Sequence, residues 1–296
     1  MNALSRLSKL VGQGSWSFYS DGVLFTRPNL TYRARLNLIL QLLSKQLRPE
    51  STLGIPYSLV VEPASVCNLN CLTCPAGQNH KMCSPAILRM EDYKKTIDLM
   101  GEYLTFIQMW SWGEPCLHPQ LAEMIAYARS KDIVVITSTN AHFLNDDEQV
   151  TRLVKSGLNE LILAVDGTTQ EVYERFRPGG NLEVVLAGIR NLVRIKREQG
   201  VTTPRLHMRM VINPFNEEQK DEFLELAETT ELNGLMIDLK AEEGVVYYES
   251  RVPTVAEVGA DQPRYDLAEV VAAAEERDLY MIGRIVAFQD PVAARA

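Results

Sequence analysis

The sequence lacks several features that mark common classes of protein. No apolar run approaches the roughly 20 residues that cross a membrane, so we expect no membrane span. Basic residues are not in excess: 30 Lys and Arg stand against 38 Asp and Glu, and the net charge of −8 disfavours binding to nucleic acid, whose phosphates need a basic surface. Residues 1–10 contain no apolar core of a signal peptide. We therefore expect a cytoplasmic protein with no nucleic-acid partner.

Cysteine is also scarce, and its distribution does not suit disulfides. The chain has five cysteines, an odd number. Cys67, Cys71 and Cys74 lie within one short segment, whereas Cys83 and Cys116 stand apart. In a reducing compartment such a cluster indicates a metal or redox site rather than a disulfide framework.

The composition and patterning that remain are those of an α/β protein. With 46% apolar and 23% charged residues, the 296-residue chain suits a globular protein of about two domains or one barrel. Short apolar segments predict strands at Tyr57–Val61, Thr105–Trp110, Ile133–Thr137, Glu160–Val165, Leu206–Ile212 and Leu235–Leu239. Segments of helical period predict helices at Met90–Glu102, Gln120–Ser130, Asp147–Ser156, Leu182–Glu198 and Glu217–Glu228. This alternation predicts a parallel sheet with its helices outside, closing toward a barrel or winding open.

The first fifty residues precede this pattern. Arg33–Leu47 has apolar and basic residues at helical spacing, so we predict that residues 1–50 form an N-terminal helical extension. A basic amphipathic helix can lie on a membrane surface, but we expect this one to pack on its own domain.

Polar residues follow four consecutive predicted strands. Cys67–Cys74 follows the first strand, Gly113-Glu114-Pro115 the second, Thr139-Asn140 the third and Asp166-Gly167 the fourth. The carboxyl ends of parallel strands meet at one edge of a sheet or barrel, where active sites lie. The sequence therefore predicts a functional site at this edge.

The spacing of the cysteines narrows the kind of site. The triplet has the pattern C-x3-C-x2-C, and soft thiolates suit zinc or iron–sulfur centres. Three thiolates can hold three irons of a cubane cluster and leave the fourth iron open to another molecule. Two alternatives remain at this point: a zinc site completed by Cys83 or His80, or three buried cysteines without a metal.

At these residues the sequence resembles the radical S-adenosylmethionine (SAM) superfamily, whose hallmark is such a loop after the first strand of a partial (βα)6 barrel. The resemblance implies that Cys67, Cys71 and Cys74 hold a [4Fe–4S] cluster, at which SAM is cleaved to a 5′-deoxyadenosyl radical. That radical would abstract hydrogen from an unknown substrate, and a low-potential electron donor of the flavodoxin or ferredoxin type would supply the electron. The implied fold is α/β, a partial TIM-like barrel over residues 51–230.

Further motifs extend the resemblance over about residues 55–228. Gly113-Glu114-Pro115 matches a Gly-Gly-Glu-Pro motif that contacts the amino group of SAM, with Trp112 in the first glycine position. Thr139-Asn140 matches a Thr-Asn-Gly pattern in which Ala141 replaces glycine. Asp166–Gly180 resembles the branch that modifies peptides, so a peptide is one candidate substrate. The cofactor-binding residues implied are Gly113, Glu114, Pro115, Thr139, Asn140, Asp166 and Asn213.

The resemblance stops near Thr229. Members of the peptide-modifying branch continue into a cysteine-rich module, whereas this chain has no cysteine after Cys116, so we expect one cluster only. Residues 233–296 resemble part of a bacterial glycoside-hydrolase-like barrel family, in which Asp238 and Asp290 would lie at strand ends. We therefore treat residues 231–296 as an atypical segment, from a fusion or a joined gene model. It could supply the last strand of the barrel, and we expect it to be weakly tied to the rest.

Two rival functions belong to other classes. A carbohydrate-active hydrolase using Asp166 or Asp238 would leave the cysteine triplet unexplained. A noncatalytic metal-binding or interaction protein is a third interpretation, compatible with the altered Trp112 position and the foreign C-terminal segment.

Overall fold

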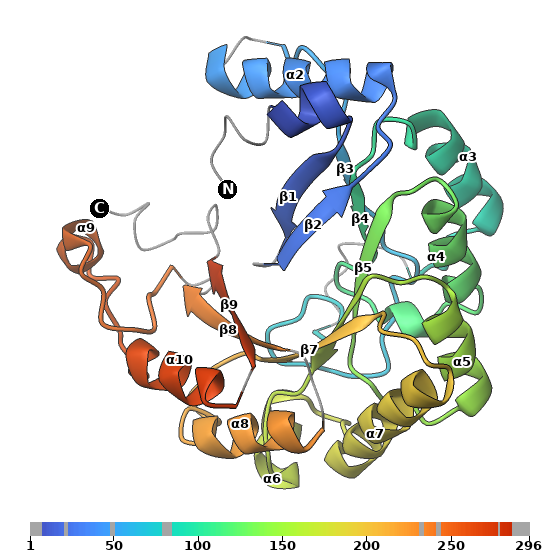
Figure 1. Cartoon of the computed structure of the whole chain (residues 1–296). Coiled ribbons are helices and arrows are strands. Elements are labelled where there is room, and N and C mark those ends of the chain that lie inside the picture. The colour runs from blue at the N-terminus through green and yellow to red at the C-terminus, as the bar shows by residue number, and fades with distance from the viewer. Residues whose placement is uncertain are drawn as a thin grey trace.

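A computed structural model describes residues 8–20, 23–47, 51–78, 85–230, 234–240, 244–277 and 279–285. Its main feature is a curved parallel sheet whose strands follow chain order, β3-β4-β5-β6-β7-β8-β9 (Figure 1). The strands are β3 (Ser58–Val60), β4 (Phe106–Gln108), β5 (Val134–Thr139), β6 (Glu160–Ala164), β7 (Arg205–Met210), β8 (Gly234–Lys240) and β9 (Tyr280–Ile285). Among the described strands β3 and β9 form the two open edges, so the α/β partial barrel predicted from the sequence is confirmed.

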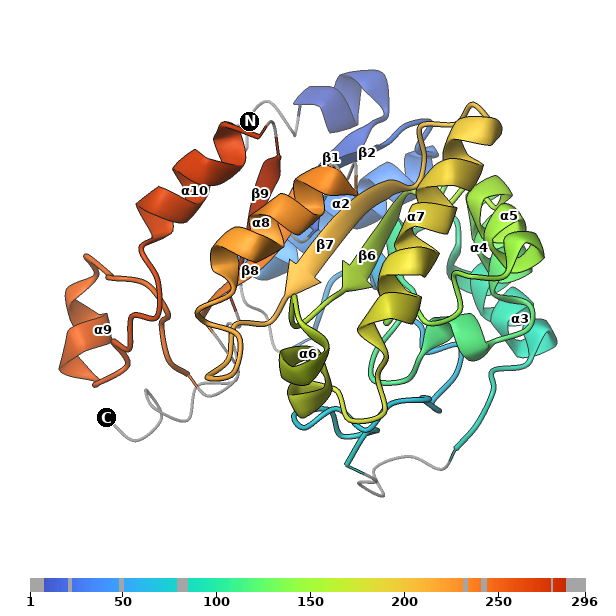
Figure 2. The same ribbon diagram turned by 90° about the horizontal axis from the view of Figure 1, so that it is seen from below.

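The helices cover the convex face of this sheet, as Figures 1 and 2 show. They are α3 (Met90–Met100), α4 (Leu121–Arg129), α5 (Asp147–Lys155), α6 (Gln170–Phe176), α7 (Leu182–Glu198), α8 (Lys220–Thr229) and α10 (Leu267–Glu275). Several begin at a polar residue that caps the free N–H groups of the first turn: Asp146 accepts from Gln149 N, and Asn181 from Val184 N. No helix in the described part of the chain has both the length and the apolar character needed to span a bilayer.

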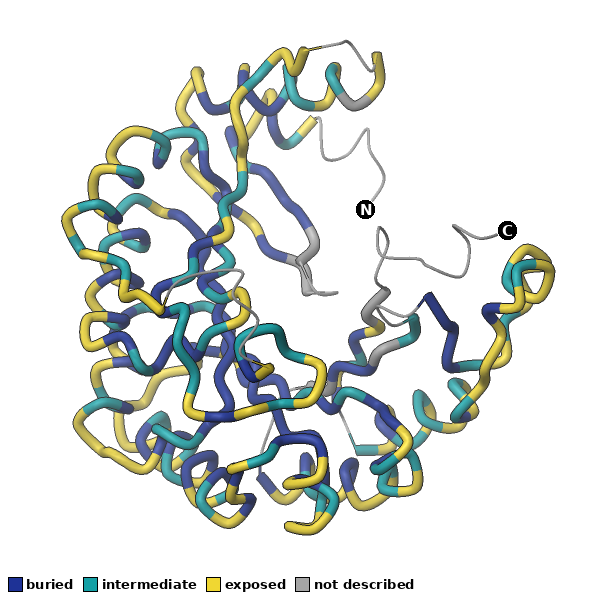
Figure 3. The backbone as a smooth tube through the Cα atoms, turned by 180° about the vertical axis from the view of Figure 1, so that it is seen from behind, coloured by how far each residue is buried: buried dark blue, intermediate teal, exposed yellow. Residues whose placement is uncertain are grey.

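Side chains alternate between two apolar cores along the central strands. On β6, Leu161 and Leu163 pack against the outer helices, whereas Ile162 faces the concave side. The central strands β5 and β6 are buried along their whole length, while the helices expose their outer faces (Figure 3). This double burial explains why the strands are nearly continuous apolar runs in the sequence.

An antiparallel hairpin occupies the concave side of the sheet (Figure 1). It consists of β1 (Trp16–Ser20) and β2 (Val23–Arg27), followed by helix α2 (Tyr32–Leu47). The ring of Phe18 stacks on that of Phe106 with centroids 4.8 Å apart, which attaches the hairpin to β4. The N-terminal segment thus contains the predicted helix and, in addition, a hairpin that the sequence analysis did not predict.

The C-terminal segment is joined to the barrel. Strand β8 pairs in parallel with β7, as expected of a sixth strand at Leu235–Leu239, and β9 adds a seventh that was not predicted. Beyond β8, Val246 and Tyr247 are buried, and Tyr247 N donates to Leu239 O. The expectation of a weakly tied tail therefore does not agree with the pairing of its strands.

One short part of this segment is nevertheless exposed. Helix α9 (Pro253–Glu257) buries none of its residues and lies at the periphery of the molecule (Figure 2). We expect trypsin to cut the described tail first at Arg251, which is exposed just before α9. The two fragments should remain associated, because α10 and β9 stay packed on β8 and α8. Mass spectrometry and gel filtration of the cut protein test this result; release of the fragment beyond the cut would contradict it.

Candidate active site

The three clustered cysteines lie in the loop after β3 and line one cavity at the carboxyl ends of the strands. This cavity is open to solvent, and the space inside it that water can reach is about 170 Å³. The loops after β4, β5 and β6 complete its wall, with Gly113, Glu114, Thr139, Asn140 and Asp166 among the lining residues. The structure thus brings together at one rim most of the residues that the sequence analysis selected.

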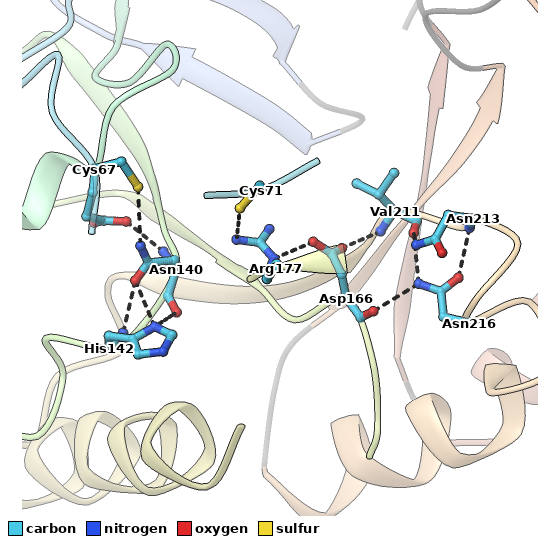
Figure 4. A network of polar contacts seen from close by, with 10 residues as sticks. Cys67, Cys71, Asn140, His142, Asp166, Arg177, Val211, Asn213 and Asn216 are labelled. Carbon is cyan, nitrogen blue, oxygen red and sulfur yellow. Dashed lines mark hydrogen bonds and ion pairs between the residues drawn. The ribbon is translucent and has the colours of Figure 1, made fainter. Parts of the chain in front are cut away.

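Each cysteine sulfur has a polar neighbour. Cys71 Sγ lies 3.9 Å from Arg177 Nη1, and Cys67 Sγ lies 3.8 Å from Asn140 Nδ2 (Figure 4). The third, Cys74 Sγ, lies 3.5 Å from the carbonyl oxygen of Trp112. Burial raises the pKa of the Cys71 thiol to about 11, although the nearby guanidinium opposes this shift. Donors placed beside sulfurs are the groups with which proteins tune iron–sulfur clusters.

The arrangement fits a cluster better than a single metal ion. In the ranges that the structure describes, no three His, Cys, Asp or Glu side chains converge on a point that one ion could occupy. A cubane needs no such convergence, because each thiolate binds a different iron. The three cysteines are partly exposed, unlike buried structural thiols, whereas Cys116 is buried outside this cavity. Cys83 and His80, the alternative zinc ligands, lie outside the described residues.

Glu114 joins the loop after β4 (the second loop) to the loop after β5 (the third loop). Its carboxylate is buried and accepts hydrogen bonds from Thr139 Oγ1 at 2.8 Å, from Asn140 N at 2.8 Å and from Cys116 N at 3.0 Å. The bond from Cys116 N caps the short turn Pro115–Leu117, in which Pro115 is the first residue. Burial raises the pKa of Glu114, against these donors. Three of the four acceptor positions of the carboxylate are therefore used within the protein.

The third loop has an unusual backbone conformation. Ala141 is fully buried with φ +65°, in the left-handed region that favours glycine. This is the position at which the Thr-Asn-Gly pattern has glycine, so the structure gives the physical reason for that pattern. Asn140 follows the strand directly and donates from Nδ2 to Asn68 Oδ1 at 2.8 Å, which links the third loop to the cysteine loop.

A buried ion pair closes the other side of the cavity. Arg177 Nε donates to Asp166 Oδ2 at 2.5 Å, and Asp166 Oδ1 accepts from Val211 N at 2.7 Å (Figure 4). Asp166 is fully buried and Arg177 nearly so. A buried carboxylate held in this way fixes the guanidinium beside Cys71. The sequence analysis quoted Arg177 within a motif but gave it no role.

Two selected residues do not line the cavity. Pro115 begins the turn after Glu114, and Asn213 is bound within its own loop, donating to Val211 O and accepting from Phe215 N. Lining residues that the sequence analysis missed include Arg209 and Ser138, which β7 and β5 place on the concave side. The period of two along a strand could have found them, because both lie on the face opposite the helix-facing core.

Comparisons with known proteins agree with this geometry. A family model described as the Radical SAM superfamily matches residues 61–227, more than half of the chain. The chain therefore belongs to the radical SAM superfamily, a family of enzymes that use a [4Fe–4S] cluster and SAM. A second model, described as "Putative glycosyl hydrolase domain", matches residues 210–296 and overlaps the first.

The curated relatives share this part of the chain. Mycofactocin maturase MftC of Mycobacterium tuberculosis is 28% identical over 178 residues, which cover 60% of this chain and 43% of the maturase. PqqA peptide cyclase of Bradyrhizobium diazoefficiens is 25% identical over 230 residues, 73% of this chain and 56% of the cyclase. Fe-coproporphyrin III synthase of Methanosarcina barkeri is 30% identical over 151 residues, 51% and 35% of the two chains. This chain thus spans less than half the length of the maturase.

Among solved structures, Streptococcus suis SuiB bound to S-adenosylmethionine superposes with a TM-score of 0.59. It is 15% identical, and the match covers 86% of this chain and 56% of SuiB. At 15% identity this match shows a shared fold only. The matched region extends past residue 227, where the radical SAM family match ends.

Proposed function

We propose that this chain cleaves SAM at a [4Fe–4S] cluster held by Cys67, Cys71 and Cys74, and thereby starts hydrogen abstraction from a peptide. The observation that carries this proposal is that the three sulfurs line one cavity with the loops after β4, β5 and β6. When bound, the reduced cluster held by these three cysteines would supply the electron for the cleavage of SAM. A flavodoxin or ferredoxin type of protein would deliver this electron.

The chain's own residues bind and orient the cofactors. The loop containing Gly113 and Glu114 would meet the amino group of SAM, and Thr139 and Asn140 hold that loop through the Glu114 carboxylate. Arg177, fixed by Asp166, places a positive charge beside Cys71, one of the residues that would hold the cluster. We assign Pro115 and Asn213 to the support of these loops rather than to direct contact. Trp110 and Trp112 add aromatic surface to the cavity wall.

The peptide class is proposed from relatives whose names describe peptide chemistry, the mycofactocin maturase and the PqqA peptide cyclase. The carbohydrate-active alternative has support in the second family match. A carbohydrate-active function would not explain the cysteine-lined cavity. Its candidate catalytic residues, Asp290 and the side chain of Asp238, lie outside the described residues. We therefore favour SAM chemistry.

The proposal is tested by anaerobic reconstitution with iron and sulfide, followed by addition of SAM and a reductant. We expect about four irons per chain, because three cysteines provide ligands for one cubane only. We expect 5′-deoxyadenosine as the main product detected, since an isolated chain without its substrate would cleave SAM unproductively. Iron near eight per chain would contradict the single cluster. A bound cluster without SAM cleavage would favour the noncatalytic metal-binding function.

A further inference from the structure

A carboxylate that none of the motifs includes contacts the second loop of the rim. Glu62 Oε1 accepts from Trp112 N at 2.8 Å and from Gly113 N at 2.9 Å. Glu62 lies two residues after β3 and five residues before Cys67. One oxygen atom therefore joins the segment that leads into the cysteine loop to the loop after β4.

These two hydrogen bonds determine where the neighbouring carbonyl groups point. The N–H of Trp112 shares a peptide plane with the C=O of Ser111, and the N–H of Gly113 shares one with the C=O of Trp112. In a trans peptide the N–H and C=O point in opposite directions. Both peptides are trans, so the two carbonyl oxygens point away from Glu62. Consistent with this, the carbonyl oxygen of Trp112 lies 3.5 Å from Cys74 Sγ, at the wall of the cavity.

The other groups nearby do not provide this orientation. The Glu114 carboxylate already accepts three hydrogen bonds, from Cys116 N, Thr139 Oγ1 and Asn140 N, and none from Trp112 or Gly113. Gly113 itself lies tightly against the backbone of Ala64, which fixes the position of the loop but not the direction of the Trp112 peptide. Glu62 is the acceptor to which both N–H groups are directed.

We propose that Glu62 is a positioning residue that aims the carbonyl oxygens of Ser111 and Trp112 at the amino group of SAM. This inference rests on the function proposed above. An ammonium group has three donors and no acceptor, so it is recognised by oxygens aimed at it in advance. Glu62 does not touch SAM in this arrangement; it acts through the two peptides that it holds.

The test compares holoenzyme variants after cluster reconstitution, with SAM binding measured by equilibrium dialysis under anaerobic conditions. Glu62→Ala removes the acceptor, and we expect about a tenfold or larger loss of SAM affinity. Glu62→Gln keeps a carbonyl oxygen and should bind SAM within about threefold of the wild type. Glu225→Ala, at an exposed position of α8, is the matched control and should bind normally. Iron content should be equal in all four proteins.

A SAM analogue without the amino group identifies the contact. The wild type should bind this analogue weakly, and Glu62→Ala should bind it no more weakly than the wild type does. Equal losses for SAM and the analogue would overturn the inference, because a general disturbance of the loop would weaken both. Unchanged SAM affinity in Glu62→Ala, or a loss in Glu62→Gln as large as that in Glu62→Ala, would overturn it too. A wild type that binds iron but not SAM would overturn the proposed function and this inference with it.

Discussion

Replacing Cys67, Cys71 or Cys74 by alanine is expected to abolish the visible absorbance of the reconstituted protein and most of its bound iron. Each thiolate binds a different iron in a cubane, so no remaining ligand can compensate for a missing one. The three sulfurs line one cavity, and the loop that carries them is fixed through Asn70 N to Pro178 O and through Leu72 N to Phe176 O. Ultraviolet–visible spectra and iron analysis after anaerobic reconstitution measure the effect.

The two other cysteines provide the controls. Cys83→Ala should keep the full spectrum and the full iron content. Cys116→Ala should also keep the cluster, because Cys116 is buried outside the cavity and burial raises its thiol pKa well above the usual value. Loss of the cluster in Cys83→Ala together with its retention in Cys71→Ala would show that the ligands are assigned wrongly.

Gly113→Ala is expected to lower the affinity for SAM by about a hundredfold or more. A Cβ at this position would lie 1.8 Å from the carbonyl oxygen of Ala64, so the loop after β4 must move away from the cysteine loop. Ala64 cannot move instead without cost, because it is buried and bridged to Ile87. The displaced loop would also lose its contacts with Glu62. We expect a loss of about 1–3 kcal/mol in the free energy of unfolding, as for other overpacked sites.

Gly12→Ala is the matched control for this substitution. A Cβ at Gly12 meets nothing within 4 Å, so alanine should be accepted there with normal SAM binding and normal stability. SAM affinity by equilibrium dialysis and thermal unfolding by circular dichroism separate the two variants. If Gly113→Ala bound SAM as well as Gly12→Ala, the close approach of the two loops would have no part in cofactor binding.

The alternation of strands and helices was readable in the sequence because it depends on local patterns. Strands β3 to β8 and helices α3, α4, α5, α7 and α8 lie where apolar runs and helical periods predicted them, with ends that differ by a few residues. The hairpin β1–β2 was missed, although its strands flank Asp21-Gly22, a pair of residues common in hairpin turns. Strand β9 was missed as well, because its segment carries Gly283 and Arg284, which interrupt the apolar pattern of a strand.

The sequence by itself identified the residues from which the chemistry of the site is proposed. The spacing of Cys67, Cys71 and Cys74 predicted a metal or redox site, and the family resemblance of these residues implied a cluster. The order of the polar residues after successive strands predicted the rim around it. Both features can be recognised in short sequence segments. Ligands within one loop are identified by their spacing, and residues after successive parallel strands are expected at one edge of the sheet.

Only the tertiary structure showed which groups contact one another at that rim. Arg177 reaches Cys71 across 106 positions of the chain, and Glu62 reaches Gly113 across 51. The pairing of β8 and β9 likewise joined the C-terminal segment to the barrel, whereas the sequence patterns indicated an atypical segment weakly tied to the rest. Contacts between distant segments depend on packing and on the direction of individual peptide and side-chain groups, and no local pattern in the sequence encodes those directions.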